Sequence, residues 1–462
     1  MKFNFLVVVT LLVSACANNP FSSYKSTSDQ QLEQVYQGNL AQALAASSHP
    51  DMLYRMELGS LLRLENNYES SAAQFNLAYN YFGTWVDQWK NTTQGQLSDS
   101  LVANLINDNA NDYPGKDYEK VFLSTYTALN YFNLHNYDYA RVNVKRIAQT
   151  EQALKNYNRS LVAQAATEQA KNTQNQGGSY LSSKVASSSF AAQFYTQVNA
   201  PEVLALQNSY QNAFSNYVAA YIYETLKDAS NARAGYLNAL ELSPSNQLIG
   251  QSLKNLDATK PLAPGYADVL IIEEVGHAPQ IKSEEFSLPF NAKFFNNDNN
   301  ANNVCLNSIN LFFPRVVADT LNNVNYGFSL DQQNYSAYLM ADTNLMLARY
   351  LHDQTAHIVA RNVAAGLRNI ASSQAVCASG GSLGSVLSLA TTLGGVMLDR
   401  ADARTWSLLP GKIYLNRVQL AYGTHVLSIN INGVVHKQRF EVTHAARILS
   451  FRVLGEQVYF TN

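Results

Sequence analysis

The spacing of apolar residues changes at about residue 260. Before it, from Ser28 onward, apolar residues recur every three or four positions and Gly and Pro are scarce, which predicts amphipathic helices. After a Pro- and Gly-containing linker at residues 261–265, short apolar runs and alternating stretches predict strands. We therefore expect a mainly α N-terminal half over residues 28–260. An α+β domain with a small antiparallel sheet of C-terminal β-strands would follow over residues 261–462.

Small and large residues share one spacing in three segments of the helical half. Small residues that let two helices approach, and aromatic residues that fill the gap, are typical of tetratricopeptide helix pairs. The segments are Gly59, Leu62, Tyr68, Phe75 and Ala78; Ala128, Tyr131, Tyr137, Ala140, Val144 and Ile147; and Ala220, Tyr223, Ala229, Ala232, Tyr236 and Ala239. Their starts are unevenly spaced, so we expect an interrupted tetratricopeptide-like array. The alternative is an irregular helical bundle that matches the spacing by chance.

Residues 151–200 are rich in Gln, Asn, Ser and Ala. Low hydrophobicity of this kind predicts exposed helix ends joined by a mobile loop, with no packed core.

Several segments of the second half predict strands or a helix. Apolar or alternating runs at residues 269–272, 286–290, 306–313, 413–420, 425–431, 434–442, 448–453 and 458–460 predict strands. Asn432 and Gly433 form the strongest hairpin signal, and Tyr422 with Gly423 predicts a second turn. Residues 336–372 predict one long amphipathic helix with Arg349 and Asp353 paired on its exposed side.

The first residues of the chain predict export and lipidation. A positive start, an apolar run and small residues over positions 1–15 are typical of a signal peptide. Leu12-Val13-Ser14-Ala15-Cys16 resembles the bacterial lipobox, which implies cleavage before Cys16, acylation of that cysteine, and a lipidated tether over residues 16–27. Ala17 is typical of sorting to the outer membrane of Gram-negative bacteria. The alternative is an ordinary signal peptide cleaved near a chance cysteine.

Composition narrows the classes of function. The 462 residues are 47% hydrophobic, and 32 Lys and Arg stand against 34 Asp and Glu, so we expect no nucleic-acid partner. After residue 16 no apolar stretch is long enough to span a bilayer. Besides Cys16 the chain has Cys305 and Cys377, which predict either a periplasmic disulfide or two buried thiols.

Candidate catalytic and metal-binding motifs are weak. Gly380-Gly381-Ser382-Leu383-Gly384 matches the G-x-S-x-G turn of serine hydrolases, but that turn needs a preceding parallel strand, and here a long predicted helix precedes it. The eight His residues are scattered without a metal-ligand spacing. We therefore expect no enzyme, metal or cofactor, with an envelope hydrolase that uses Ser382 as the alternative.

Five stretches together resemble an uncharacterised family of proteobacterial lipoproteins with a tetratricopeptide-like first half. They are residues 113–120, 126–131, 140–146, 273–282 and 401–410. Where the family pattern has an acidic residue, this chain has Asn143. The family has no settled activity, and its relatives accompany lipoproteins that activate peptidoglycan synthases, which implies a role in the cell envelope.

Two groups of residues in these stretches are candidates for recognition. Tyr113, Tyr118 and Glu119 form either a recognition patch or a helix cap with core aromatics. Asp402, Arg404 and Trp406 form either a charge-assisted corner that defines the fold or a ligand site. Together, the sequence predicts a lipid-anchored periplasmic scaffold or adaptor of the outer membrane, with a helical groove for a protein or peptide partner.

Overall fold

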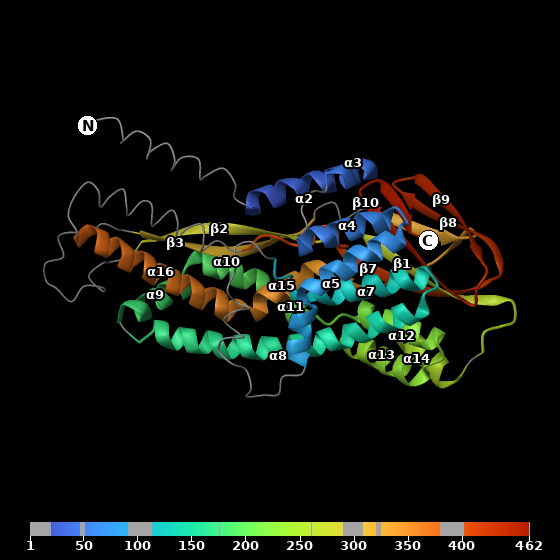
Figure 1. Ribbon diagram of the computed structural model, residues 1–462, viewed down its shortest axis with the longest axis horizontal. Coiled ribbons are helices and arrows are strands. Elements are labelled where there is room, and N and C mark those ends of the chain that lie inside the picture. The colour runs from blue at the N-terminus through green and yellow to red at the C-terminus, as the bar shows by residue number, and fades with distance from the viewer. Residues whose placement is uncertain are drawn as a thin grey trace.

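The computed structural model describes residues 20–46, 51–90, 113–174, 176–259, 261–289, 308–319, 325–378 and 402–461. The predicted signal peptide, Cys16, Cys305 and Ser382 lie outside these ranges, and of Cys377 the structure describes only the backbone. Helices fill the chain up to Asp257 and a mixed α+β region follows, so the predicted fold class is confirmed (Figure 1).

The first region contains twelve helices among the residues that the structure describes. They are α2 (Pro20–Tyr36), α3 (Leu40–Ala45), α4 (Met52–Leu64), α5 (Tyr68–Lys90), α7 (Asp117–Asn133), α8 (Tyr137–Asn172), α9 (Gln176–Ala186), α10 (Ser189–Val198), α11 (Pro201–Leu204), α12 (Ala213–Thr225), α13 (Ala229–Leu242) and α14 (Gln247–Asp257).

Each of the three repeat-like segments forms a helix hairpin: α4–α5, α7–α8 and α12–α13. Their turns share one geometry, because Asn66, His135 and Lys227 each adopt a left-handed backbone conformation, with φ of 62°, 57° and 62°. In each turn the following residue, an Asn or Asp, donates its backbone N–H to a carbonyl five residues back, as in a Schellman motif. The recurrence of the turn supports a repeated unit.

Small residues allow close approach within a hairpin. A Cβ atom on Gly59 would lie 2.4 Å from Cε1 of Phe75, so a larger residue there would push the two helices of the first hairpin apart.

The strands form two sheets and a ribbon. Among the described residues the larger sheet has the order β11-β10-β1-β7-β6, the second sheet β5-β4-β8-β9, and β2 pairs only with β3. The bounds are β1 (Tyr266–Val275), β2 (Gln280–Pro289), β3 (Ser308–Val317), β4 (Tyr326–Leu330), β5 (Gln333–Asn334), β6 (Tyr338–Asp342), β7 (Lys412–Ala421), β8 (Gly423–Ile431), β9 (Val434–Val442), β10 (Ala446–Leu454) and β11 (Gln457–Thr461).

Pairing in the sheets is antiparallel except between β1 and β10, which are parallel. The predicted Asn432-Gly433 turn joins β8 to β9 as a hairpin. Tyr422 is also a turn position, but it carries the chain from β7 in the larger sheet to β8 in the second sheet rather than forming a hairpin.

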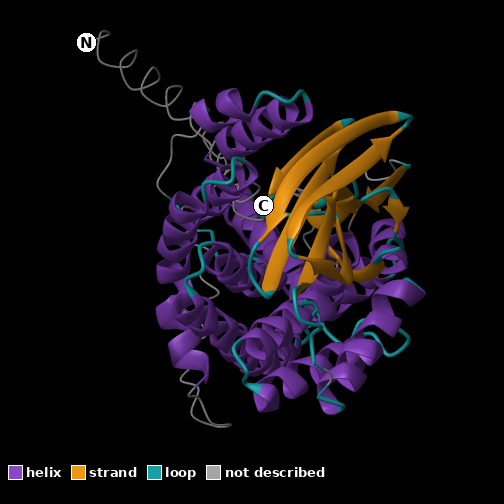
Figure 2. Ribbon diagram, turned by 90° about the vertical axis from the view of Figure 1, so that its right-hand side faces the viewer, coloured by secondary structure: helices purple, strands orange, loops and turns teal. Residues whose placement is uncertain are grey.

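The larger sheet lies between the helices and the second sheet (Figure 2). Side chains of β1 alternate accordingly, with Leu270 and Ile272 in the core shared with the helices, and Val269 and Ile271 in the core between the two sheets. Because the first core includes residues from both regions, the helices and the strands stabilise each other.

The prediction of one long helix over residues 336–372 is wrong. Residues 338–342 form β6, followed by α15 (Thr343–Asp353) and α16 (Thr355–Ala378). The side chain of Asp342 accepts the backbone N–H groups of Asn344 and Leu345 and caps α15, so the helix begins there. Arg349 does pair with Asp353 at 2.9 Å, but its guanidinium also donates to the carbonyl of Leu206 and is not on an exposed face.

The prediction for residues 151–200 is also wrong in its main point. This segment continues α8 and forms α9 and α10, and residues such as Leu154, Leu181 and Val198 are fully buried. The amide of Gln197 donates to the carbonyl and accepts the N–H of Val316, and so covers part of the β3 edge. A polar residue of this segment thus orders the chain by pairing with a strand backbone.

Candidate functional site

The segment of residues 402–410, which we call the corner segment, lacks regular structure and packs against the helical region. Glu57 of α4 holds it from one side. Its carboxylate is 1% exposed and accepts the backbone N–H groups of Ser407 at 2.7 Å and Leu408 at 2.9 Å, together with the Tyr24 hydroxyl at 2.9 Å. Burial raises the pKa of Glu57 to about 7, against the opposing effect of these three donors.

Glu119, in the first turn of α7, holds the corner segment from a second side. Its carboxylate accepts the backbone N–H of Trp406 at 2.8 Å, the backbone N–H of Lys116 at 2.8 Å and the Tyr113 hydroxyl at 2.5 Å. Burial raises the pKa of this carboxyl too. One carboxylate therefore caps a helix and fixes a segment that lies far from it in the sequence.

Trp406 anchors the corner segment in the helical core. Its ring is fully buried and packs edge-on against the Phe75 ring, with 5.6 Å between the ring centres. The indole N–H donates a hydrogen bond to the Ser60 hydroxyl at 2.9 Å. A buried indole with a satisfied N–H gives both apolar contact and orientation.

Asp402 and Arg404 form a bidentate pair at the start of the corner segment. The guanidinium of Arg404 donates to both carboxylate oxygens, at 3.0 and 2.9 Å, and lies over the Tyr113 ring at 5.3 Å. Burial acts to raise the pKa of Asp402, but the charges of Lys116 and Arg404 outweigh it and hold the pKa below its usual value.

The structure thus joins five of the six predicted recognition residues into one contact network: Tyr113, Glu119, Asp402, Arg404 and Trp406. Tyr118 is fully buried on the same helix, with its ring edge against Phe122. Asn143, which replaces the expected acidic residue, donates its side-chain amide to the Tyr139 carbonyl.

Sequence reasoning missed Glu57 and Tyr24. Each is an isolated residue in a helix, and the positions that they contact are several hundred residues away, so no local pattern marks them.

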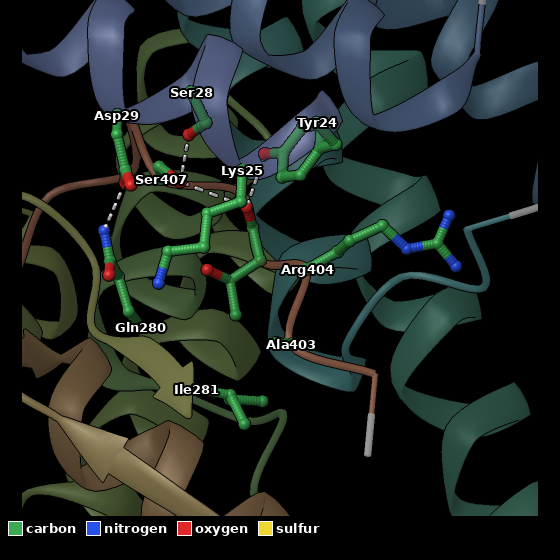
Figure 3. A pocket seen from close by; sticks show the side chains of 10 residues that line it. Tyr24, Lys25, Ser28, Asp29, Gln280, Ile281, Ala403, Arg404 and Ser407 are labelled. Atoms are coloured by element: carbon green, nitrogen blue, oxygen red, sulfur yellow. Dashed lines mark hydrogen bonds between the residues drawn. The ribbon is translucent and has the colours of Figure 1, made fainter. Parts of the chain in front are cut away.

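Cavities border the corner segment on several sides, and two of them have charged or polar walls at residues 402–405. The smaller of these two, of about 50 Å³, lies between α2 and residues 403–405 (Figure 3). Its walls are joined by hydrogen bonds from Ser28 to Ser407 and from Gln280 to Asp29, at 2.7 and 3.0 Å. In Figure 3 the Arg404 guanidinium points away from this cavity, towards the other side of the corner segment.

The larger cavity, of about 140 Å³, we call the interhelical pocket. It lies where the N-terminal end of α7, the middle of α8, the junction of α15 and α16, and the β2–β3 ribbon come together beside Asp402. Its wall is partly apolar, with residues such as Leu161 and Phe312. The charged part of the wall consists of Lys116, Asp117, Lys120, Arg361 and Asp402.

Two lysines of the interhelical pocket are buried. Lys120 is 5% exposed and lies 3.6 Å from Asp117, and burial lowers its pKa although that carboxylate opposes the effect. Lys116 is 4% exposed, and its ammonium lies 5.7 Å from the ring centres of both Tyr113 and Tyr350. A site that holds two buried ammonium groups beside an open cavity is able to bind an anion.

Within the residues that the structure describes, no group of three or more His, Cys, Asp or Glu side chains is arranged to hold a metal ion. Among the helices described, none combines the length and the apolar character needed to cross a bilayer.

Comparison of the chain with known protein families, with curated proteins and with solved structures found no match. The resemblance to a lipoprotein family therefore stays a prediction.

Proposed function

We propose that the protein is a lipid-anchored lipoprotein of the outer membrane that faces the periplasm and acts as a protein-binding scaffold or adaptor in the cell envelope. The lipobox that ends at Cys16 supports the anchor. The observation that carries the binding role is the interhelical pocket, which is open, part apolar and part charged, and is bounded by helices and strands of both regions.

The partner site belongs at this pocket because the chain covers other faces of the helix hairpins itself. The Tyr221 hydroxyl of α12 donates to the carbonyls of Asp268 and Arg447 in the larger sheet. Arg63 of α4 donates to the Ser450 hydroxyl of β10 in the same way. A partner that bound along these helix faces would first have to displace the larger sheet. A partner that bound in the interhelical pocket would not have to displace any strand.

Site-specific photocrosslinking tests the binding role. A photoreactive amino acid is placed at Gln354, which lines the interhelical pocket, and in a control at Tyr422, an exposed position in the turn between β7 and β8. We expect position 354 to give discrete crosslinked products in intact envelopes and position 422 to give none of them. Equal products at both positions, or no product at 354, would contradict the scaffold role.

Metabolic labelling with an alkyne-bearing palmitate tests the anchor independently. The wild-type protein should be labelled and remain in the outer-membrane fraction, whereas Cys16→Ser should be unlabelled. Label on the Cys16→Ser protein, or its absence from the wild type, would contradict lipidation at Cys16.

A further inference from the structure

The geometry points to the interhelical pocket as a binding site for the C-terminal carboxylate of a peptide chain whose last side chain is apolar. This inference rests on the proposed scaffold function, and it adds the chemistry of the group that the pocket binds.

The main observation is the incomplete hydrogen bonding of Lys116. Its ammonium carries three N–H donors. Among the described residues it makes one hydrogen bond, a long one of 3.4 Å to the backbone carbonyl of Asp402, and no carboxylate lies within ion-pair distance of it. The faces of two tyrosine rings partly compensate the charge. The carboxylates of Asp402 and Glu119 act on this charge only from beyond ion-pair distance, so a cation that is 4% exposed keeps N–H donors without acceptors, and an anion in the pocket would supply them.

A second donor lies beside this ammonium. Tyr350 lines the pocket, its ring faces Lys116, and its hydroxyl makes no hydrogen bond within the part of the chain that the structure describes. Burial raises the pKa of Tyr350, so the hydroxyl keeps its proton at neutral pH and is available as a donor. A carboxylate has two acceptor oxygens and can accept from both groups at once.

The acidic residues of the pocket do not take the place of such a ligand. Asp402 already accepts two hydrogen bonds from Arg404. Asp117 lies 3.6 Å from Lys120 and accepts the side-chain amide of Asn158 at 2.9 Å. Both carboxylates are therefore hydrogen-bonded to other donors, and N–H donors of Lys116 remain without an acceptor among the described residues.

The rest of the wall favours a peptide over other carboxylates. Apolar side chains such as Leu161, Phe312 and Ile358 offer contact for one apolar side chain, and a cavity of about 140 Å³ is close to the roughly 150 Å³ that accepts benzene. The side-chain amide of Gln354 lines the same space. An alkyl chain would offer no hydrogen-bond partner to that amide, whereas the N–H and C=O groups of a peptide can pair with it.

Calorimetric titration of the full mature protein in detergent tests this inference. The probes are N-acetylated tripeptides that end in leucine or phenylalanine, each as the free acid and as the C-terminal amide. We expect the free acids to bind at least about tenfold more tightly than the amides, since a hydrogen bond to a charged group is worth roughly a factor of ten or more.

Three variants connect the effect to the pocket. Lys116→Met should weaken binding of the free acids about tenfold or more and remove their advantage over the amides, and Lys116→Arg should restore that advantage. Tyr350→Phe should weaken the free acids several-fold. Lys25→Met, which removes an exposed cation at the smaller cavity, should change nothing. Melting curves establish that each variant is folded before it is compared.

Three results would overturn the inference: equal binding of acids and amides, binding of decanoate as tight as that of the peptides, or no binding of any free acid at about 1 mM. Photocrosslinking at position 354 distinguishes failure of the carboxylate site from failure of the scaffold role. Crosslinked products that persist in the Lys116→Met variant would support the scaffold role and contradict the carboxylate site. Absence of these products in the protein that is otherwise wild type would contradict both proposals.

Discussion

Replacement of Glu57 by Gln tests the role of the buried carboxylate that holds the corner segment. The folded protein raises the pKa of Glu57 from 4.5 to about 7 by burial, so the folded state binds this proton more tightly than the unfolded state does. The stabilising contribution of the group is complete below about pH 4.5 and is lost as the pH rises to about 7. At about 1.4 kcal/mol per pH unit, this shift corresponds to a loss of about 3 kcal/mol across that window.

Glu57→Gln cannot titrate, so its stability should depend less on pH than that of the wild type. At pH 5 we expect the variant to be less stable by about 1 to 3 kcal/mol, because its amide nitrogen faces a buried backbone N–H and one hydrogen bond is lost. By pH 8 the wild type has lost its pH-dependent contribution, and the difference should close or reverse. Glu151 and Glu273 also have raised pKa values, but they are present in both proteins and cancel in the comparison.

Urea unfolding followed by tryptophan fluorescence at pH 5, 6, 7 and 8 measures these free energies. Glu65→Gln, at an exposed position at the end of the same helix, serves as the matched control and should stay within about 0.5 kcal/mol of the wild type at every pH. Parallel curves for the wild type and Glu57→Gln would refute the assignment of a raised pKa to this carboxyl.

Three further predictions concern packing, turns and cysteines. Gly59→Ala places a methyl group 2.4 Å from an aromatic carbon of Phe75 and should lower the free energy of unfolding, measured in urea, by about 1 to 3 kcal/mol. Gly250→Ala is the control: nothing lies within 4 Å of its added methyl group, and it should raise that free energy by up to about 1 kcal/mol. Equal effects of the two variants would contradict the close contact between Gly59 and Phe75. Lys227→Gly should stabilise the third hairpin by about 0.5 to 1 kcal/mol because φ there is 62°, and a loss would argue against that turn. Thiol titration of the denatured, unreduced protein tests the bridge between Cys305 and Cys377, and two free thiols would exclude it.

The parts of the fold that could be predicted are those specified locally. Each hairpin carries small residues at the helix contact and an Asn or Asp that begins its second helix, and both features lie within a short stretch of sequence. The C-terminal strands alternate, and Asn432-Gly433 adopts the positive φ angles that its turn needs. Helix and strand types were therefore largely correct.

The parts that could not be predicted depend on tertiary contact. Residues 338–342 have no strong preference of their own and become a strand because they pair with β7. Gln197 orders its segment because the edge of β3 accepts its amide. In the candidate site, Asp402, Arg404 and Trp406 could be found from their clustering in the sequence. Glu57 could not, since its importance comes only from the backbone that folds onto it.

The position of β10 inside the larger sheet has a consequence for the order of folding. β10 lies between β1 and β11, and β1 cannot complete its pairing until residues 446–454 are available. Arg63 of α4 and Tyr221 of α12 also find their partners on or beside this strand. The larger sheet therefore closes only after the C-terminal strands have been synthesised, so its assembly comes late in folding. It also means that loss of about the last seventeen residues would remove the strands on which Arg63 and Tyr221 find partners, although α4 would keep its contacts with the corner segment.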